Sequence, residues 1–525
     1  MSALSHTESA EAHYKRGVSL QNLGNYDHAL EAFNAAIALN PSYAEAYNYR
    51  GIVLVILERH HDALTSFNKA VALKPDYAEC HNNLGIVLQD LGYFDEALAS
   101  FDRAIALKPD NARAHNNRGA ALSDLRRIDD ALISYEEAIA LDPSYAEAFY
   151  NRGMVMHDAK RFDHALASYD KAIALRPDYA EAHHNRGAVL QDLLRLDDAI
   201  GVYDKAIKLR PDRAESYANQ SYCYLQMGRF EEGWPLHDWR KKLQTPVGAR
   251  AFAQPLWLGR EDITDKTLFV HWEQGFGDTI QFCRYGRLLK ARGINTVMSV
   301  QEPLYRLLLQ MSPEIAIINE TEVPASFDYH SPMMSLPFAL TTTLGTIPAE
   351  SRYIFSDERL RRAWDAHLPA NTKPRVGVAW RGSSTHRNDR NRSIDLAMLA
   401  PLFSPDAHWI SLQYESGRPE TAPYDLPQLF SYPGMWKDFA DAAALIDNLD
   451  LVITVDTSVA HLAGAMGKPV WILLPFNSDW RWLLHRDDSP WYSSARLFRQ
   501  KPSEPWAHVI AHVRTAFSEF IQSRS

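Results

Sequence analysis

Three polar segments of this 525-residue chain each come directly after a short apolar run, and their residues suit contact with a phosphate-bearing ligand. In LVITVDTSVAHLAGAMGKPVWILLP, the apolar run ends at Asp456, Thr457 and Ser458, and a helix-like segment follows. The free backbone N–H groups and the positive dipole end at such a helix start form an anion site. We therefore expect these three residues to bind phosphate. His461 would either reach the same phosphate or satisfy a neighbouring backbone group.

The segment AWRGSSTHRNDRNRS gathers arginines and small hydroxyl residues after a second apolar run. A guanidinium presents its N–H donors in a planar fork that fits phosphate oxygens. Four guanidiniums in one loop predict an anion contact, and our candidates for it are Arg381, Ser383 and Arg392. A solvated surface loop is the alternative.

The third segment, HWEQGFGDTIQFCRYGRLLK, passes from an apolar run at residues 268–271 through Gly275 and Gly277 to a helix starting near Asp278. A glycine-rich turn of this kind is weak evidence alone, because many α/β proteins use one to pack a helix on a sheet. An aspartate at such a helix start commonly caps the helix, and we expect Asp278 to be able to do so.

The elements that would position these residues are parallel strands alternating with helices. Short apolar runs recur from Thr267 onward, namely TLFVH, TVMSV, AIIN, RVGVAW, HWISL, LVITV and VWILLP. This alternation predicts doubly wound α/β lobes, in which ligands bind beyond the C-terminal strand ends. A charged, proline-containing stretch at 349–374 divides the runs into two groups. We expect a first lobe at 255–355, a second lobe at 373–500 and a closing helix at 505–525.

The N-terminal half repeats itself every 34 residues, which predicts a solenoid of paired helices over residues 10–245. Small residues allow close helix contact, and an aromatic residue fills the space between the helices of each repeat. We count six complete repeats and a degraded seventh, in which Ser221 stands where glycine is expected. The prolines that mark the period are Pro41, Pro75, Pro109, Pro143, Pro177 and Pro211, and the glycines are Gly17, Gly51, Gly85, Gly119, Gly153 and Gly187.

Two polar rows run along the first helices of the repeats. Members of one row stand seven residues before members of the other, so both rows share a helix face, which we expect on the concave side. An amide both donates and accepts hydrogen bonds, which suits the backbone of an extended peptide. The alternative is bonding between repeats or plain solvation. The rows are Asn83, Asn117, Asn151, Asn185 and Asn219, and Asp90, Asp124, Asp158 and Asp192.

The repeats resemble the tetratricopeptide family, and the two rows resemble the asparagine and aspartate ladders of eukaryotic O-GlcNAc transferase. The DTSVAHLAGAMGKP string, the WRGSSTHRNDRNRS loop and the Gly277–Asp278 pair resemble the heptosyltransferase-like glycosyltransferases (family nine), over residues 260–500. The resemblance implies a GT-B arrangement of two Rossmann-like lobes behind an all-α solenoid. The layout is similar to that of O-GlcNAc transferase and of bacterial protein glycosyltransferases.

The family resemblance implies a metal-independent, inverting transfer with no cofactor, in which Asp278 removes the acceptor proton; capping of its helix is the alternative. An aspartate near its ordinary pKa of about 3.9 is a weak base, so this role requires a desolvated or anionic surrounding. It places the donor phosphates near the arginine loop and Thr457. The nucleoside contacts would be Gln413, Tyr414, Glu415, Asp438 and Phe439, although Phe439 could equally be a core residue. The acceptor side would include Gln274, Gly277 and His330, and a structural role for His330 is the alternative.

Composition and motifs exclude several other classes. Lys and Arg total 55 against 65 Asp and Glu, a formal charge of −10, so no broad basic surface is available for nucleic acid. Three scattered cysteines provide neither a disulfide framework nor a Cys-based zinc site, which favours a reducing cytoplasm. No run reaches the roughly 18 apolar residues that a bilayer crossing requires, so membrane insertion is not expected. Neither HExxH nor GxSxG occurs, which argues against a metal or serine hydrolase.

These observations favour a cytoplasmic enzyme that moves a sugar from a nucleotide-sugar donor to a Ser or Thr hydroxyl of a protein recruited by the repeats. The rival is a non-catalytic repeat scaffold whose transferase-like domain only binds, and the short first lobe favours it. A third reading has a lipid-linked or saccharide acceptor, with the repeats recruiting a complex.

Overall fold

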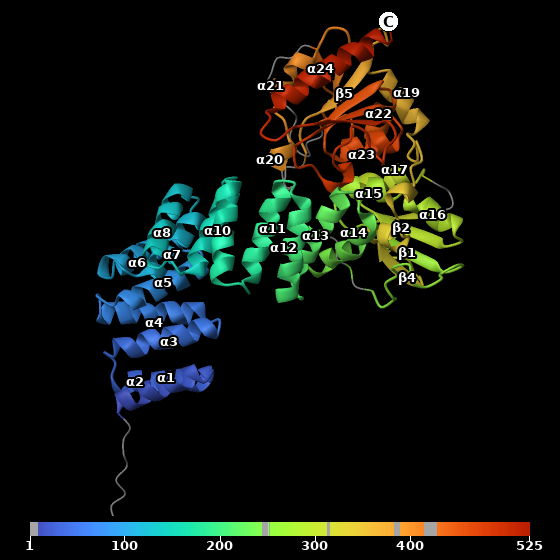
Figure 1. The fold of residues 1–525 in the computed structure, drawn as a ribbon. Helices are drawn as coiled ribbons and strands as arrows, with labels where there is room; N and C mark the ends of the chain where they lie inside the picture. Colours follow the sequence, from blue (N-terminus) through green and yellow to red (C-terminus); the bar gives the residue numbers. More distant parts are fainter. Residues whose placement is uncertain are drawn as a thin grey trace, which may run out of the picture. The chain divides into compact units, whose positions relative to one another are not determined.

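The computed structural model describes residues 9–243, 250, 252–311, 315–382, 389–413 and 428–524 (Figure 1). Contacts divide the chain into two compact units, Met1–Leu190 with Asp204–Arg210, and Gln191–Tyr203 with Pro211–Ser525. The seventh helix pair, assigned to the solenoid from the sequence, therefore packs within the unit of the α/β half.

Paired antiparallel helices form the solenoid, as the 34-residue period predicts. In each of the first five repeats a glycine of the first helix faces an aromatic ring of the second: a Cβ at Gly51 would lie 2.5 Å from the Phe67 ring. Only glycine permits this approach. The helices are α1 (Ala10–Asn22), α2 (Tyr26–Leu39), α3 (Ala44–Ile56), α4 (His60–Leu73), α5 (Ala78–Asp90), α6 (Phe94–Leu107), α7 (Ala112–Asp124), α8 (Ile128–Leu141), α9 (Ala146–Asp158), α10 (Phe162–Leu175), α11 (Ala180–Asp192), α12 (Leu196–Leu209), α13 (Ala214–Gln226) and α14 (Phe230–His237), followed by the 3-10 turn η1 (Asp238–Lys242).

The first α/β lobe has a parallel four-stranded sheet in the order β3-β2-β1-β4. Strand β4 was not predicted, because its first two residues, Tyr329 and His330, are only half-buried and give no apolar run. The strand order reverses between β1 and β4, which is where such lobes bind ligands. The elements are β1 (Thr267–His271), α15 (Phe276–Phe282), α16 (Tyr285–Ala291), β2 (Asn295–Val300), α17 (Glu302–Leu308), β3 (Ala316–Asn319), β4 (Tyr329–Pro332), η2 (Met333–Ser335), α18 (Leu336–Ala339) and η3 (Leu344–Thr346).

The second lobe has a parallel six-stranded sheet in the order β10-β9-β8-β5-β6-β7, the doubly wound Rossmann order. Its switch point lies between β5 and β8, which pair in register from Val376 opposite Leu451. The elements are α19 (Glu358–Asp365), β5 (Arg375–Ala379), α20 (Asp389–Arg392), α21 (Leu396–Leu399), η4 (Ala400–Leu402), β6 (His408–Ser411), β7 (Leu429–Phe430), α22 (Phe439–Asp447), β8 (Leu451–Val455), α23 (Ser458–Ala465), β9 (Val470–Leu474), η5 (Trp480–Trp482), β10 (Ala495–Arg499) and α24 (Trp506–Gln522).

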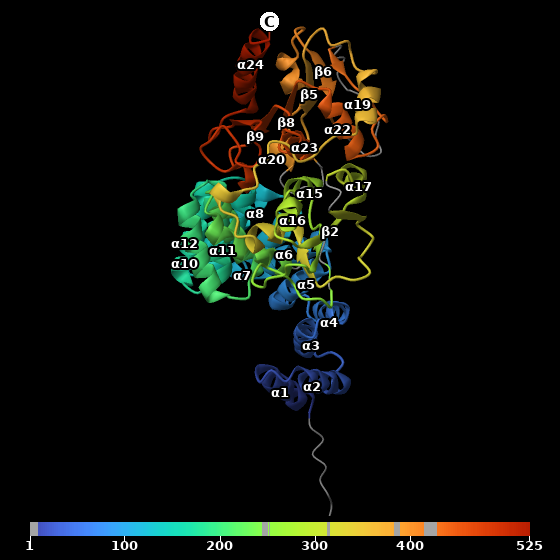
Figure 2. The ribbon, with the colours of Figure 1, turned by 90° about the vertical axis from the view of Figure 1, so that its right-hand side faces the viewer.

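The closing helix α24 packs on the second lobe, where the rings of Phe517 and Trp409 lie 4.9 Å apart between centroids. Figure 2 shows α15 and α17 of the first lobe next to α23 and α22 of the second, and these helices contact one another. One apolar core joins both lobes to the seventh helix pair through Phe230 and Trp234. No helix within the described residues is both long and apolar enough to span a membrane.

Candidate functional site

The residues expected to bind phosphate meet where β5 and β8 end, at the switch point of the second lobe. Thr457 caps α23, its hydroxyl accepting a hydrogen bond from the Val459 N–H at 3.2 Å. Arg392 reaches across from α20 and donates to the Asp456 backbone oxygen at 2.8 Å. The N-terminus of α23 and the half-buried Arg392 guanidinium therefore lie close together, an electrostatic arrangement that favours an anion, and phosphate binding by these residues stays a prediction.

Gln413 orders the start of the arginine loop. Its side-chain oxygen accepts from the backbone N–H groups of Trp380 and Arg381 at 3.3 and 3.0 Å. The Arg381 side chain itself is exposed. Ser383, Tyr414 and Glu415, which the sequence singles out, lie outside the described residues.

The Asp456 carboxyl group at this position has a raised pKa. Burial and the nearby Asp479 carboxylate raise its pKa to about 6, against the lowering effects of Arg392 and Arg481. A carboxyl group with such a pKa can change its protonation near neutral pH, a property that recurs at functional sites.

Asp278 lies in the first turn of α15 and uses both carboxylate oxygens. One accepts from the Gly275 N–H at 2.8 Å, which is the helix-capping contact that the sequence offered as an alternative. The other forms an ion pair with Arg481 of the second lobe. The cap therefore exists, and the charge beside the carboxylate is the positive one of Arg481, not the negative one that would strengthen a base, so the role of Asp278 as a base stays a prediction.

Arg481, which the sequence analysis did not single out, joins the two lobes at this point. Its Nε donates to Gln281 at 2.8 Å, one terminal nitrogen donates to Asp479 at 2.9 Å, and the other binds Asp278. The guanidinium also lies over the Trp480 ring at 4.4 Å. Burial alone would lower the pKa of Arg481, but Asp479 and Asp278 outweigh it and raise the pKa, so the residue is a fixed cation.

His461 packs between the lobes. Its Nδ1 lies 2.9 Å from the Tyr492 hydroxyl, and its ring stacks on Trp482 with centroids 5.3 Å apart. A Cβ at Gly277 would lie only 2.7 Å from His461 Cδ2, so glycine at 277 permits the approach of the helices. Burial, followed by the charges of Arg481, Arg284 and Arg392, lowers the pKa of His461 well below its ordinary value, so the ring is neutral. Phosphate contact by His461 stays a prediction, and the geometry favours its structural alternative.

The expected acceptor-side residues divide between two places. Gln274 lies in the loop before Asp278, and its backbone oxygen accepts from Gln301 at 3.0 Å. His330 instead faces His271 across neighbouring strands, with ring nitrogens 3.4 Å apart, and packs on Phe252. Burial lowers the pKa of His330.

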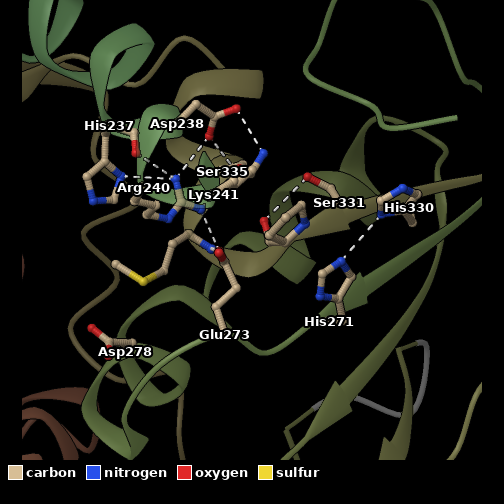
Figure 3. A network of polar contacts seen from close by, with 12 residues as sticks. His237, Asp238, Arg240, Lys241, His271, Glu273, Asp278, His330, Ser331 and Ser335 are labelled. Carbon is tan, nitrogen blue, oxygen red and sulfur yellow. Dashed lines mark hydrogen bonds and ion pairs between the residues drawn. The ribbon is translucent and has the colours of Figure 1, made fainter. Parts of the chain in front are cut away.

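A buried ion-pair network, which sequence reasoning missed, covers the ends of β1 and β4 (Figure 3). Arg240 of η1 donates to Glu273 at 2.5 Å and to Ser335 at 3.0 Å. Asp238 accepts from Ser335 at 2.7 Å and pairs with Lys241 at 2.9 Å. The last turn of the repeats thus lies on the switch point of the first lobe. The sequence offers one signal for this network, which is Glu273 in the HWEQGFGD segment. No local pattern links Glu273 to Arg240, because Arg240 lies 33 positions earlier in the chain.

Asp438 and Phe439, expected at the nucleoside, lie at the start of α22 and face the first lobe. Asp438 caps the helix and pairs with Arg306 of α17 at 2.8 Å. The Phe439 ring lies 5.2 Å from that of Phe276. Both residues therefore contribute to contact between the lobes, and nucleoside binding by them stays a prediction.

In the asparagine row, each amide bonds to the preceding repeat. The side-chain nitrogens of Asn83, Asn117 and Asn151 donate to the asparagine 35 residues earlier at 3.0 to 3.1 Å, and Asn185 donates to Tyr150 at 3.0 Å. Asn219 hydrogen-bonds Tyr203. All five are half-buried, so the inter-repeat bonding named as the alternative is present, and peptide binding by the remaining amide groups stays a prediction.

In the aspartate row, Asp90, Asp124 and Asp158 are exposed. Asp90 lies 3.8 Å from His60, and Asp124 accepts from Gln89 at 2.6 Å. Asp192 differs, because it accepts at 3.3 Å from Asn477 in the loop after β9.

Comparison with known families agrees with this organisation. Tetratricopeptide-repeat models match residues 14–78, 88–125, 112–145, 156–193 and 184–233. The model of glycosyltransferase family 9 (heptosyltransferase) matches residues 437–474, which contain α22, β8, α23 and β9 and the expected phosphate-binding residues Asp456, Thr457 and Ser458. The N-terminal half therefore carries tetratricopeptide repeats, and the α/β half carries a segment similar to glycosyltransferase family 9.

Protein FlbA of Caulobacter vibrioides is 25% identical over 332 residues, covering 57% of this chain and 54% of that protein. The chain thus spans about half the length of this curated relative. Among solved structures, YrrB, described as a tetratricopeptide protein with an unusual peptide-binding site, is 29% identical over 34% of this chain and 93% of its own, with a TM-score of 0.31. A thermophilic tetratricopeptide protein of Thermus thermophilus is 27% identical over 35% of this chain and 99% of its own, with a TM-score of 0.31.

Proposed function

We propose that the chain is a glycosyltransferase that moves a sugar from a nucleotide-sugar donor to a Ser or Thr hydroxyl of a protein. The observation that carries this proposal is the convergence of the α23 N-terminus and Arg392 with the Asp278–Arg481 pair. The candidate anion site and the candidate base come from different lobes: the charge of Asp479 acts on Asp456 of the anion site, and Asp479 pairs with Arg481, which binds Asp278.

In the proposed reaction, the N–H groups near Thr457 and Ser458 stabilise the leaving diphosphate, with Arg392 adding positive charge. Such preorganised electrostatics usually contribute the largest part of catalysis. Asp278 accepts the acceptor's hydroxyl proton as the oxygen attacks the anomeric carbon, with inversion. The transfer needs neither metal nor cofactor in this proposal.

The network at the first-lobe switch point supports a protein acceptor over a small saccharide or lipid-linked one. A small acceptor would be expected beyond the ends of β1 and β4. Arg240 and Glu273 occupy that place, with 4% and 7% of their surface exposed. Because residues of η1 and of the first lobe fill this place, the proposal assigns selection of the acceptor to the repeats.

The cytoplasm is the proposed location, because Cys80, Cys223 and Cys283 are all free and buried. The rival function is a non-catalytic scaffold that binds partners with its repeats. The short first sheet favours it, since four strands leave less surface for an acceptor than six would.

Calorimetric titration with UDP, GDP, ADP, CMP and dTDP tests the donor site. One nucleotide should bind, and the Thr457→Ala, Ser458→Ala variant should bind it more weakly. The matched control is Thr343→Ala, which removes the capping threonine of η3 and should leave affinity unchanged. Failure of every nucleotide to bind would favour the scaffold.

A further inference from the structure

One face of α13, the first helix of the seventh repeat, continues the polar rows of the repeats. Asn219, Tyr222 and Gln226 stand three and four residues apart, so they share a helix face. We call these three residues the α13 face. Asn219 and Gln226 occupy the positions of the asparagine and aspartate rows. Tyr222 occupies a position that is aliphatic or methionine in the other repeats, namely Val18, Ile52, Ile86, Ala120, Met154 and Ala188.

The α13 face contacts the loop after β9, which leads directly to the candidate site. Gln226 donates to the Asn477 side-chain oxygen at 3.1 Å and to the Ser478 backbone oxygen at 2.8 Å. Asn477 in turn donates to Asp192. Asp479, which follows Ser478 in this loop, accepts a hydrogen bond from Arg481, and Arg481 also pairs with Asp278.

Tyr222 lies at the point where the α13 face meets this site. Its ring is partly buried against the shared core and lies 5.9 Å from that of His237, which in turn lies 6.2 Å from Trp480. Burial raises the pKa of Tyr222, and the charges of Asp479 and Asp278 add to this effect, while Arg481 and Arg240 oppose it. The phenol therefore stays protonated, and its helix α13 contacts η5, which carries Arg481 of the candidate site.

We propose that Tyr222 is an acceptor-binding residue, whose hydroxyl donates a hydrogen bond to a backbone carbonyl of an extended peptide and so holds the acceptor hydroxyl beside Asp278. This inference rests on the proposed function. A neutral phenol near two carboxylates offers a donor for a carbonyl oxygen without adding charge. The α13 face is then one wall of the transfer site, and the last repeat delivers the peptide to it.

The test compares Tyr222→Phe with Tyr217→Phe, a control on the same helix that keeps the ring stacked on Trp239 at 3.8 Å. The probes are a library of Ser- and Thr-centred peptides and, as acceptor-free reference, hydrolysis of the nucleotide sugar by water. Tyr222→Phe should lower kcat/KM for peptide transfer about three- to tenfold, as expected for one lost hydrogen bond. Nucleotide affinity and hydrolysis should stay at wild-type values, and Tyr217→Phe should behave as wild type.

Unchanged peptide transfer by Tyr222→Phe, with normal hydrolysis, overturns this inference and leaves the proposed function standing. An equal loss of hydrolysis and nucleotide affinity shows a structural role and overturns it too. A wild-type protein that neither binds nucleotide nor hydrolyses a nucleotide sugar overturns both proposals. As a measurement independent of turnover, Tyr222→p-benzoylphenylalanine should crosslink to the peptides on irradiation, whereas the same replacement at Tyr217 should not.

Discussion

Asp278 both caps α15 and pairs with Arg481. A variant that tests its role as a base must therefore remove the charge and keep the cap. Asp278→Asn keeps a side-chain oxygen for the Gly275 N–H but cannot accept the acceptor proton. We expect sugar transfer to fall about 10²- to 10⁴-fold, the usual contribution of a general base, with nucleotide affinity retained. Asp395→Asn, a change in the cap of α21, is the control. Turnover close to wild type with normal nucleotide binding would remove Asp278 from the mechanism.

His271 makes the folded protein sensitive to acid. Burial, followed by the charge of the nearby His330, lowers its pKa to about 3, so the folded state does not bind the proton that the unfolded chain takes up near pH 6.5. Its contribution to stability is complete above pH 6.5 and is lost at up to about 1.4 kcal/mol per pH unit as the pH falls below that value.

His271→Phe should therefore reduce the fall in Tm between pH 6.5 and 4.5, since the ring already packs beside Phe252 and Phe269. Thermal unfolding followed by circular dichroism over this range measures the effect. His512→Phe, at an exposed position of α24, should keep the wild-type pH profile. Parallel Tm profiles for His271→Phe and wild type would contradict the assignment.

At the scale of elements, η1 is fixed on the first lobe by a buried ion pair. Removing one partner leaves an uncompensated buried charge, so Arg240→Met and Glu273→Gln should each lower the free energy of unfolding by about 3–5 kcal/mol. The double variant Arg240→Met, Glu273→Gln should cost less than the sum of the single changes. Urea unfolding of the four proteins gives the coupling energy. Additive effects would mean that the pair does not hold η1.

The sequence predicts those elements whose signal is local. Glycine and an aromatic residue recur with the 34-residue period because they meet within the repeats, as Gly51 and Phe67 do. Fully buried strands such as β5 and β8 are continuous apolar runs, and so are found. Strands β4 and β10 mix exposed or polar residues with apolar ones and are missed.

The same limit applies to the candidate site. Asp456, Thr457 and Ser458 are predictable because a strand end and a helix start are adjacent in the chain. Arg481 and Asp278 are in contact although 203 residues separate them in the sequence. Arg240 contacts Glu273 because η1 packs on the first lobe. Contacts of this kind are created by the tertiary fold, and no spacing in one sequence signals them.

At the scale of the whole molecule, the seventh helix pair belongs energetically to the α/β half. Leu225, Phe230 and Trp234 are buried in the core shared with both lobes, and Trp234 donates to the Thr342 backbone oxygen at 2.9 Å. Burying each of these side chains contributes about 1.5–3 kcal/mol. A fragment of residues 191–525 should therefore unfold cooperatively, whereas residues 250–525, which lack this pair and Arg240, should not.

Thermal unfolding and light scattering of the two fragments measure this difference. Residues 191–525 should keep the nucleotide affinity of the full chain, because Thr457, Arg392 and Arg481 all remain with their partners. They should lose affinity for protein acceptors, because most of the asparagine row is absent. Equal stability of the two fragments would show that the seventh pair is not part of this core. Full acceptor affinity in residues 191–525 would instead place acceptor selection in the α13 face alone.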